Sequence, residues 1–559
     1  MKRVLQLAAL TMLAVPVLAL DGQPGIHDPS TVIVENGKFY TFGTGAGLPI
    51  SVSDDGWTWR RAGALMDRLI GGRNKATLER GGNNTWAPDV IRSGNQYFVY
   101  YSAPGTQPKS AIGLLVGKTL DPASPDYGWE DRGPVVSSDG VEDLNAIDPG
   151  VLRDAAGRLW LTYGSYFGYI RLVELDPKTG LRLYPNRPAV NVAINSEASI
   201  LIQRDGWYYL LVTHGSCCAG ANSSYNIRMG RSRQATGPFL DNMGVDMLQG
   251  GGKLFLGSGG RFIGPGHFGL LDLGQGVEKF SLHYEADLDR GGMSVLDIRP
   301  LLWRDGWPVA GENFKEGVYQ FESARTGTAM EMAVQGVPVG GARGRGGFGG
   351  PGPGAGRGGG RGDAPGAPPA GGRGPVVGPG AAGPGPGPGA VPGPGAGPGL
   401  GGAPPAAPGA GRGGRGDGPP GPPIPAQDAA AVSANWPAGA ADVRLSQYMV
   451  QAQQKWSVTP VANAGGYPGS PYFKITVAGT DRALAATADR ELTVKPAFTG
   501  APEELWRIDQ LSDGSYRVMP KAVPNTTDAL ALSAIGSSKP TLSAFVPSSD
   551  RQRWIIKTP

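Results

Sequence analysis

Three acidic residues stand at the same distance from a glycine and an aromatic residue. Asp28, Asp148 and Glu197 are each followed by Gly nine residues later and by Tyr or Trp twelve residues later. Each segment predicts a strand, a tight turn and a second strand, repeated as in propeller blades. Because equivalent positions on successive blades converge near the central axis, we expect the three carboxyl groups to face one cavity. Clustered carboxyl groups there indicate hydrolysis of glycosidic bonds.

The other blades follow from the same spacing. Trp86 stands twelve residues before Phe98, so this blade presents an indole where others present acids, and an indole suits a sugar ring. His267 belongs to a fifth segment and is followed by Gly276 nine residues later. Five such segments fill residues 22–312. The sequence therefore predicts an all-β chain that begins with a five-bladed β-propeller.

Length and composition predict a modular chain. A chain of 559 residues is too long for one ordinary core. Its 93 Gly and 51 Pro are too many for a chain that is folded throughout. The formal charge of +4 is small for this length and favours neither nucleic acid nor a polyanionic substrate.

The first residues predict export. Met1-Lys2-Arg3 precedes an apolar run from Val4 to Leu20, and small residues near position 19 suit cleavage, so residues 1–19 are predicted to be a signal peptide. A membrane anchor is the alternative, but the run barely reaches the ~18 residues needed to span a bilayer and contains Pro16. We therefore expect a secreted or periplasmic protein with no membrane partner.

The only two cysteines are adjacent, at Cys217 and Cys218. A disulfide between neighbours closes a small ring, so this exported chain cannot rely on a disulfide framework. Their redox state is left open. No second cysteine pair with metal-ligand spacing follows, which argues against a metal site at this pair.

Residues 336–431 consist almost entirely of Gly, Pro, Ala and Arg. Such a tract cannot bury enough apolar surface to fold, so a disordered insertion is predicted. Its Arg-Gly pieces are also found in nucleic-acid-binding segments, but export and the lack of interleaved aromatic residues favour a solvated spacer and no nucleic-acid partner.

A threefold repeat surrounds this tract. Trp456, Trp506 and Trp554 end related phrases, and a strand of one type precedes each. The first of these strands, at 317–321, lies before the low-complexity tract, and its Trp lies after it. We infer that residues 336–431 are an insertion in a surface loop of the first repeat of a domain spanning 316–559, because the cost of closing a loop grows only slowly with length.

The Gln-x-Trp phrases resemble the ricin-type β-trefoil, a frequent carbohydrate-binding module. The first and third repeats have Gln454 and Gln552 two residues before Trp, whereas the second has Glu504. The resemblance implies polysaccharide binding, with a structural or protein-docking role as alternatives. The Trp residues themselves are expected in the core.

The first 312 residues resemble glycoside hydrolase family 43, and within it the arabinan endo-1,5-α-L-arabinosidases. The resemblance rests on several motifs in the family's order. They are His27-Asp28-Pro29-Ser30, Trp86-Ala87-Pro88-Asp89, Ile147-Asp148-Pro149-Gly150, Ser196-Glu197-Ala198, Cys217-Cys218-Ala219-Gly220, Gly264-Pro265-Gly266-His267 and Asp305-Gly306-Trp307-Pro308.

The resemblance implies an inverting hydrolase of arabinan, acting in plant cell-wall polysaccharide degradation. Asp28 would be the general base and Glu197 the general acid, while Asp148 would raise the pKa of the acid and orient it. Inversion needs room for a water molecule, hence base and acid carboxyl groups ~6.5–9.5 Å apart. In the family, the residue matching His267 reaches a hydrated ion, generally calcium, so a structural calcium ion on the propeller axis is implied.

Departures from the family pattern leave the substrate open. Glu197 is followed by Ala-Ser where the family commonly has Ala-Pro, and the segment 164–168, with Ser165 and Phe167, replaces a more usual aromatic order. Because these positions border the sugar subsites, Ser165 and Phe167 are predicted to bind substrate, and Trp86 is predicted to do so from its register in the second blade. An exo-acting arabinofuranosidase, a β-xylosidase and a noncatalytic glycan-binding protein remain alternatives.

Overall fold

The computed structural model describes residues 20–70, 84–105, 108–141, 144–334, 436, 438–536 and 539–559. Within these ranges every regular element is a β-strand or a short 3-10 helix, so the all-β prediction is confirmed. No helix there has the length and apolar character that crossing a membrane requires. The predicted signal peptide (1–19) and the predicted insertion (336–431) lie outside the described residues.

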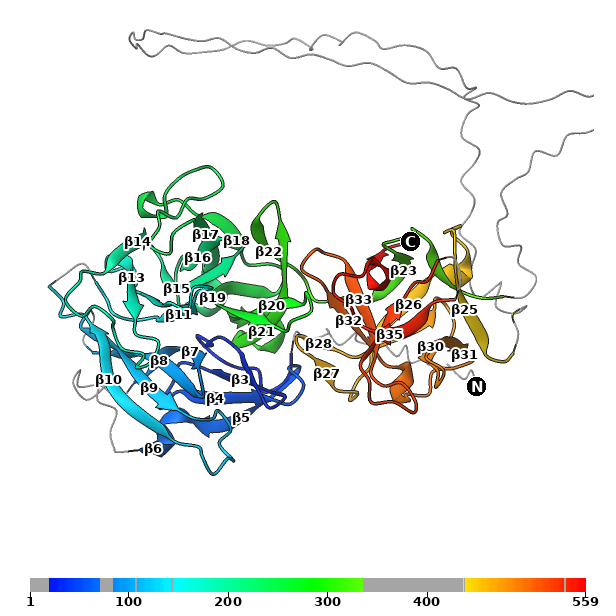
Figure 1. Ribbon diagram of the computed structural model, residues 1–559, viewed down its shortest axis with the longest axis horizontal. Coiled ribbons are helices and arrows are strands. Elements are labelled where there is room, and N and C mark those ends of the chain that lie inside the picture. Colours follow the sequence, from blue (N-terminus) through cyan, green and yellow to red (C-terminus); the bar gives the residue numbers. More distant parts are fainter. Residues whose placement is uncertain are drawn as a thin grey trace, which may run out of the picture. The chain divides into compact units, whose positions relative to one another are not determined.

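Five separate sheets follow one another along the chain and stand around a common centre, as predicted for a five-bladed propeller (Figure 1). The first sheet contains β1 (Asp21–Gly22), β2 (Ile33–Glu35), β3 (Lys38–Phe42), β4 (Pro49–Ser53) and β5 (Thr58–Ala64). The second contains β6 (Leu69–Ile70), β7 (Trp86–Ser93), β8 (Gln96–Pro104), β9 (Ser110–Gly117) and β10 (Trp129–Ser137).

The other three sheets have four strands each, in sequence order. The third contains β11 (Gly150–Arg153), β12 (Leu159–Tyr163), β13 (Tyr169–Leu175) and β14 (Val190–Ile194). The fourth contains β15 (Glu197–Arg204), β16 (Trp207–His214), β17 (Asn226–Ser232) and β18 (Lys253–Leu256). The fifth contains β19 (Phe262–Asp272), β20 (Glu278–Asp287), β21 (Met293–Arg304) and β22 (Trp307–Ala310).

The glycines of the repeated pattern close the hairpins. Glu35 pairs with Lys38 and Arg204 pairs with Trp207, so the loops between them are two residues long. Gly37 and Gly206 are the second loop residues, with φ of +78° and +74°. Two-residue hairpins with positive φ match the right-handed twist of the strands, and Gly adopts this φ without steric cost.

The blades are held together by apolar side chains on both faces of each sheet. Tyr101 packs with Phe42 in a cluster shared by the first and second blades. Its neighbour Tyr100 packs with Leu161 in a cluster shared by the second and third blades. Successive side chains of a strand point to opposite faces, and here both faces are buried. β8 is therefore buried along almost its whole length, and neighbouring blades are fixed against each other.

The C-terminal part forms a ten-stranded sheet and two small hairpins. Six strands pair in a closed ring: β23 (Gly317–Ser323), β26 (Trp456–Pro460), β29 (Phe473–Val477), β32 (Trp506–Gln510), β33 (Tyr516–Pro520) and β36 (Trp554–Lys557). Three hairpins join them: β24 (Ala329–Met332) with β25 (Ala441–Ser446), β30 (Ala483–Ala486) with β31 (Leu492–Lys495), and β34 (Leu530–Ser533) with β35 (Thr541–Ala544). The pair β27 (Gly466–Tyr467) and β28 (Ser470–Pro471) is the other small hairpin.

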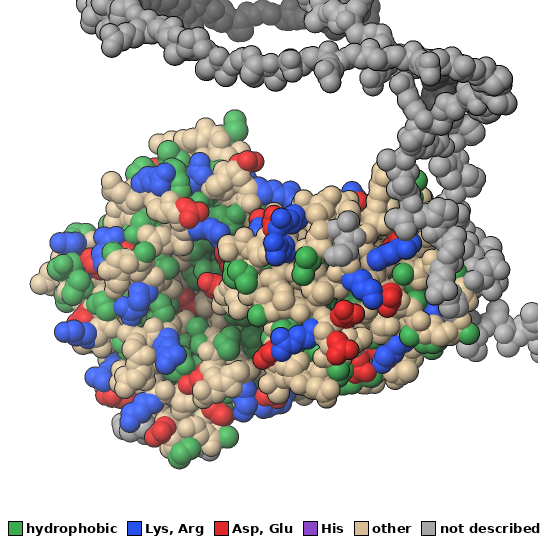
Figure 2. Space-filling model, turned by 45° about the vertical axis from the view of Figure 1, so that its right-hand side comes forward, with side chains coloured by type: hydrophobic (Ala, Val, Ile, Leu, Met, Phe, Trp, Pro, Cys, Tyr) green, Lys and Arg blue, Asp and Glu red, His purple; other side chains and the backbone are tan. Residues whose placement is uncertain are grey.

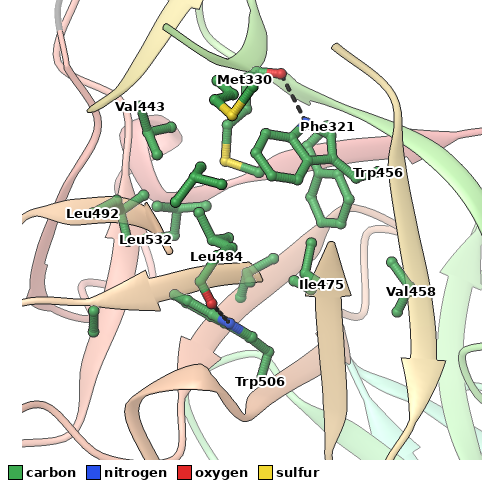
Figure 3. Packing of buried hydrophobic residues seen from close by; sticks show 14 of the residues in the cluster. Phe321, Met330, Val443, Trp456, Val458, Ile475, Leu484, Leu492, Trp506 and Leu532 are labelled. Carbon is green, nitrogen blue, oxygen red and sulfur yellow. Dashed lines mark hydrogen bonds between the residues drawn. The ribbon is translucent and has the colours of Figure 1, made fainter. Parts of the chain in front are cut away.

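The three repeated tryptophans lie in the core of this part, as expected. Trp456, Trp506 and Trp554 are fully buried. Each indole N–H donates to a backbone carbonyl, that of Met330 at 2.9 Å, Leu484 at 3.0 Å and Leu532 at 3.0 Å. Figure 3 shows the bonds of Trp456 and Trp506. The buried indole nitrogens are thus paired in the same way three times, as burial of a polar group requires.

Candidate active site

Each blade opens with one non-glycine residue in the left-handed backbone region. Asp28, Ala87, Asp148, Ala198 and His267 have φ between +40° and +55°. The sequence predicted that the three acids occupy equivalent positions in their blades. This is right for Asp28 and Asp148, but in the fourth blade the equivalent residue is Ala198, one residue after Glu197. The spacing misleads because Gly206 follows Ala198 by eight residues, whereas the turn glycine follows Asp28 and Asp148 by nine. The distance from the strand end to the turn therefore differs between blades.

The inner strand ends surround a cavity of about 620 Å³. Figure 2 shows acidic side chains among hydrophobic ones where the propeller is hollowed. The lining side chains come from all five blades and from the loop after β16: His27, Asp28, Thr44, Trp86, Ile147, Asp148, Glu197, Cys217, Cys218, Gly220, Tyr225, His267 and Glu285. The three predicted catalytic acids thus face one cavity.

Asp28 is buried among cationic and hydroxyl donors. Thr44 Oγ1 donates to its Oδ2 at 2.5 Å, His27 Nδ1 lies 2.8 Å from the same oxygen, and His267 Nδ1 lies 3.0 Å from Oδ1. Burial by itself would raise the pKa of Asp28, but the charges of His267 and His27 outweigh it and hold the pKa well below its usual range. Asp28 is therefore ionised at neutral pH.

Two histidines orient Asp28, His283 on β20 and His27, its neighbour in the chain. The backbone N–H of Asp28 donates to His283 Nδ1 at 2.8 Å, and burial lowers the pKa of His283 to about 4, so this ring is neutral and accepts the bond. His27 bridges Asp28 and Glu285, which lies 3.0 Å from its Nε2. Burial opposes the charge of His27, but the two carboxylates outweigh burial and raise its pKa to about 10.

The pKa of each of the other two predicted acids is raised. Burial is the largest cause that raises the pKa of Glu197, and the charges of Asp28 and Glu285 add to it. Burial also raises the pKa of Asp148, to about 8, with a contribution from Glu197. Asp148 lies between two blades, because its Oδ2 accepts the N–H of Ala198 at 3.2 Å. The cavity thus combines two carboxyl groups with lowered pKa, Asp28 and Glu285, with two whose pKa is raised, the division of roles that acid–base hydrolysis needs.

The predicted substrate-binding residues differ in their positions. Trp86 lines the cavity, as predicted. Ser165 and Phe167 are not among its lining residues: Ser165 is 2% exposed and accepts a hydrogen bond from Asn145 Nδ2, and Phe167 is 50% exposed. Burial of Ser165 leaves it no free surface for a sugar in this conformation.

His267, the predicted metal ligand, lies at the cavity with one nitrogen unengaged. Its Nε2 is buried and has no hydrogen-bond partner among the described residues. A buried nitrogen without a partner is unfavourable unless another group satisfies it. The residue therefore fits the role of a ligand to a cation, while its Nδ1 faces Asp28.

Four residues of the site were not predicted from the sequence. Thr44, Tyr225 and His283 contact the predicted acids, and Glu285 contacts His27 beside Asp28, but none of the four belongs to a spacing pattern. They come from second or third strands or from loops, and only blade packing brings them to the axis. The adjacent cysteines were noted in the sequence, but neither their redox state nor their place could be predicted. Cys217 and Cys218 are disulfide-bonded and line the cavity.

Comparison with known proteins identifies the family. Residues 16–308 match the family model for glycosyl hydrolases family 43. An extracellular exo-α-(1→5)-L-arabinofuranosidase of Cellvibrio japonicus is 34% identical over 327 residues, which are 55% of this chain and 92% of that protein. An extracellular endo-α-(1→5)-L-arabinanase of Bacillus subtilis is 34% identical over 293 residues, which are 51% of this chain and 87% of that protein.

A solved structure is similar as well. The exo-1,5-α-L-arabinanase from a bovine ruminal metagenomic library is 36% identical, with a TM-score of 0.48, over 52% of this chain and 99% of that one. Since the family model covers more than half of the chain and the two relatives match over most of their own length, the chain belongs to glycosyl hydrolases family 43 and is a glycosidase.

Proposed function

We propose that the enzyme is exported and hydrolyses the α-1,5-linked L-arabinofuranose chains of arabinan in plant cell-wall polysaccharide degradation, with inversion at the anomeric carbon. The observation that carries this proposal is the pairing, in one cavity, of ionised Asp28 with Glu197, whose pKa is raised. The arabinan-degrading activities in the names of both relatives support the substrate.

Asp28 acts as the general base. A carboxylate has about four lone-pair sites. Two on Oδ2 are used by Thr44 and His27, and one on Oδ1 faces His267. One site of Oδ1 remains for water. Asp28 Oδ1 takes a proton from this water as the water oxygen bonds to the anomeric carbon of the sugar.

Glu197 acts as the general acid. Its carboxyl proton passes to the glycosidic oxygen as the bond between that oxygen and the anomeric carbon breaks. Tyr225 O–H donates to Oε1 of Glu197, so Oε2 is the oxygen that carries the proton toward the leaving group. Asp148, with a pKa of about 8, assists from the neighbouring blade and contacts the backbone of Ala198 beside the acid.

We also propose a structural calcium ion beside the cavity, with His267 Nε2 as its protein ligand. The support is the buried Nε2 without a hydrogen-bond partner among the described residues. Ligation requires the neutral ring, so the bound ion would supply, in place of protonated His267, the positive charge near the acids. Calcium prefers oxygen ligands, so water would complete its coordination.

For residues 316–559 we propose a ricin-type β-trefoil with residues 336–431 inserted in its first repeat. The closed ring of six strands, the three hairpins and the threefold Trp contacts support the fold. The insertion is supported by the direct pairing of β24 with β25, the strands on either side of it. Polysaccharide binding by this domain is part of the proposal. Binding of the full chain to insoluble arabinan, compared with a chain ending at residue 312, would test it.

The two relatives are equally identical to this chain, and one is named as exo-acting and the other as endo-acting. The products of hydrolysis therefore have to distinguish the two cleavage modes. The experiment follows the products released from linear α-1,5-arabinan over time, beside Asp28→Asn and Glu197→Gln variants. Oligosaccharides of mixed length identify endo cleavage, and arabinose or one short product identifies exo cleavage. Proton NMR of the first product should show the β-anomer.

Two outcomes would contradict the proposal. Hydrolysis that persists in both variants would exclude these acids as the catalytic pair. No hydrolysis of arabinan by the wild type, with xylo-oligosaccharides or aryl β-xylosides cleaved instead, would overturn the substrate and favour the β-xylosidase alternative. An α-anomer as the first product would overturn inversion alone.

A further inference from the structure

The disulfide between Cys217 and Cys218 lies in the wall of the catalytic cavity. The pair stands in the loop between β16 and the 3-10 helix Gly220–Asn222, and both residues line the cavity. A ring nitrogen of His27 and the two sulfur atoms all lie within 4.8 Å of one another. Cys217 is half-buried and Cys218 is exposed. The disulfide is therefore accessible from the cavity and adjacent to the residue that contacts the base.

Glu285 holds this loop and the base together. Its Oε2 accepts the backbone N–H of Cys218 at 3.0 Å, and its Oε1 lies 3.9 Å from Cys217 Sγ. The same Oε1 lies 3.0 Å from His27 Nε2, and His27 Nδ1 contacts Asp28. Glu285 is 4% exposed, so it is fixed in place. One buried carboxylate thus sets the position of the disulfide relative to Asp28.

A sugar bound in the cavity needs uncharged surface to pack against. A furanose ring presents C–H groups as well as hydroxyls, and sugar sites combine polar groups with apolar or aromatic walls. Charged and polar side chains supply the reacting groups of this cavity, and its apolar surface comes from a few residues, among them Trp86 and Ile147 on two neighbouring blades. The bonded sulfurs add a compact, polarizable and uncharged surface on the side of the fourth and fifth blades.

The covalent bond also fixes the backbone that makes this surface. Cys218 has φ of +60°, in the left-handed region that non-glycine residues avoid. Ring closure between neighbours restricts the rotation of both side chains and of the peptide between them. Without the bond, Cys218 is free to return to an ordinary φ, which turns its N–H away from Glu285 and moves both sulfurs.

We propose that the Cys217–Cys218 disulfide is a substrate-binding wall of the catalytic cavity, which Glu285 holds at a fixed place and against which the sugar unit packs. The proposal rests on the proposed arabinan hydrolase function. It assigns to the pair a contact with substrate, not a structural cross-link of the fold, because the bond joins adjacent residues.

The chain has two cysteines in all, so reduction changes only this bond. A phosphine reduces the disulfide to two thiols and becomes a phosphine oxide, with its oxygen and the two protons taken from water. The experiment measures kcat and KM on arabino-oligosaccharides for the wild type before and after phosphine treatment. Thiol titration confirms that two thiols form, and thermal unfolding confirms that the fold is kept. Cys217→Ala/Cys218→Ala, with and without phosphine, is the matched control.

Reduction should raise KM about tenfold, the size expected for losing about 1.4 kcal/mol of sugar contact, and change kcat less than about threefold. The double variant should show the raised KM and no response to phosphine. Glu285→Leu should also raise KM while its disulfide stays closed, because leucine has no atom that accepts the N–H of Cys218.

Three results would overturn the proposal. One is an unchanged KM in a folded, fully reduced wild type. Another is a fall in kcat at constant KM, which would assign the loop to positioning of Asp28 and not to substrate contact. The third is a wild type that neither cleaves nor binds arabino-oligosaccharides, which overturns this proposal and the proposed function together. The first two results leave the proposed function intact if the wild type cleaves arabinan normally.

Discussion

Tyr225 donates its hydroxyl hydrogen to Oε1 of Glu197, and the two residues come from the loop before β17 and the first residue of β15. The bond occupies one oxygen of the proposed acid and leaves the other for the leaving group. It also lowers the pKa of Glu197, opposing burial, which is the largest cause that raises it. Tyr225 therefore sets both the orientation of the acid and the pH at which it loses its proton.

Replacing Tyr225 with Phe should reduce kcat about tenfold, which corresponds to about 1.4 kcal/mol of barrier height. The Glu197 carboxyl must be protonated to act, so the alkaline limb of the pH profile reports its ionisation. Because the tyrosine bond lowers the pKa of Glu197, its loss should move this limb to higher pH. The measurement is kcat against pH on an arabino-oligosaccharide.

Tyr100→Phe is the matched control, because Tyr100 is also buried and its hydroxyl donates to the carbonyl of Gly180, away from the cavity. This variant should lose stability without a shift of the alkaline limb. An equal shift in both variants, or none in Tyr225→Phe, would contradict the role given to Tyr225.

The two acids should respond differently to the leaving group. Glu197→Gln removes the proton donor, so aryl α-L-arabinofuranosides with acidic phenols, which leave without protonation, should retain far more activity than arabinan. Asp28→Asn removes the base that activates water and should lose at least about 10³-fold on both substrates. Rates on a phenol series measure the dependence. A steep dependence in Asp28→Asn and a flat one in Glu197→Gln would mean that the roles are exchanged.

The residues at the inner strand ends of the blades could be predicted from the sequence. The other residues that line the cavity could not. Asp28, Asp148 and His267 recur with the turn glycines because each blade repeats one local geometry, and all three have the same left-handed conformation. Glu197 was found but placed one residue out, because the number of residues between the strand end and the turn glycine differs between blades. Glu285 contacts His27 across 258 residues of sequence, and such contacts arise only when the first and fifth blades meet.

Asp509 should be a strong stabiliser of the C-terminal part. Its side chain is fully buried between Arg507 and Arg517, with contacts of 2.6 Å and 2.7 Å. Asp509→Asn leaves two guanidinium groups without their counter-charge and should cost about 3 kcal/mol of unfolding free energy. Urea unfolding measures it. Asp528→Asn is the control, because its pair with Arg490 is exposed and should contribute less than about 1 kcal/mol.

The same aspartate predicts a pH dependence of stability. Burial would raise the pKa of Asp509, but the two arginines outweigh it and lower the pKa to about 2. A carboxyl with a depressed pKa stabilises the folded state above its unfolded pKa of about 4 and loses this contribution as pH falls toward about 2. Wild-type stability should therefore fall more steeply over this range than that of Asp509→Asn. Parallel curves would assign the acid sensitivity to other groups.

The second repeat of the C-terminal part exchanges the donor and acceptor of a pair that the other two repeats share. Gln454 Nε2 donates to Ser446 Oγ at 3.0 Å and Gln552 Nε2 donates to Ser543 Oγ at 2.9 Å. In the second repeat, Lys495 Nζ instead donates to Glu504 Oε1 at 2.7 Å. The glutamate that departs from the Gln-x-Trp pattern is thus matched by a lysine on the facing strand.

This exchange predicts a compensating double variant. Glu504→Gln leaves Lys495 without its buried carboxylate partner, and Lys495→Ser leaves that carboxylate without its cation, so each single change should cost about 1–3 kcal/mol. Lys495→Ser/Glu504→Gln recreates the Gln–Ser pair and should be more stable than the sum of the single changes by at least about 1 kcal/mol. Urea unfolding of the four proteins completes the cycle. Additive losses would mean that the two side chains act independently and that the exchange of partners has no energetic basis.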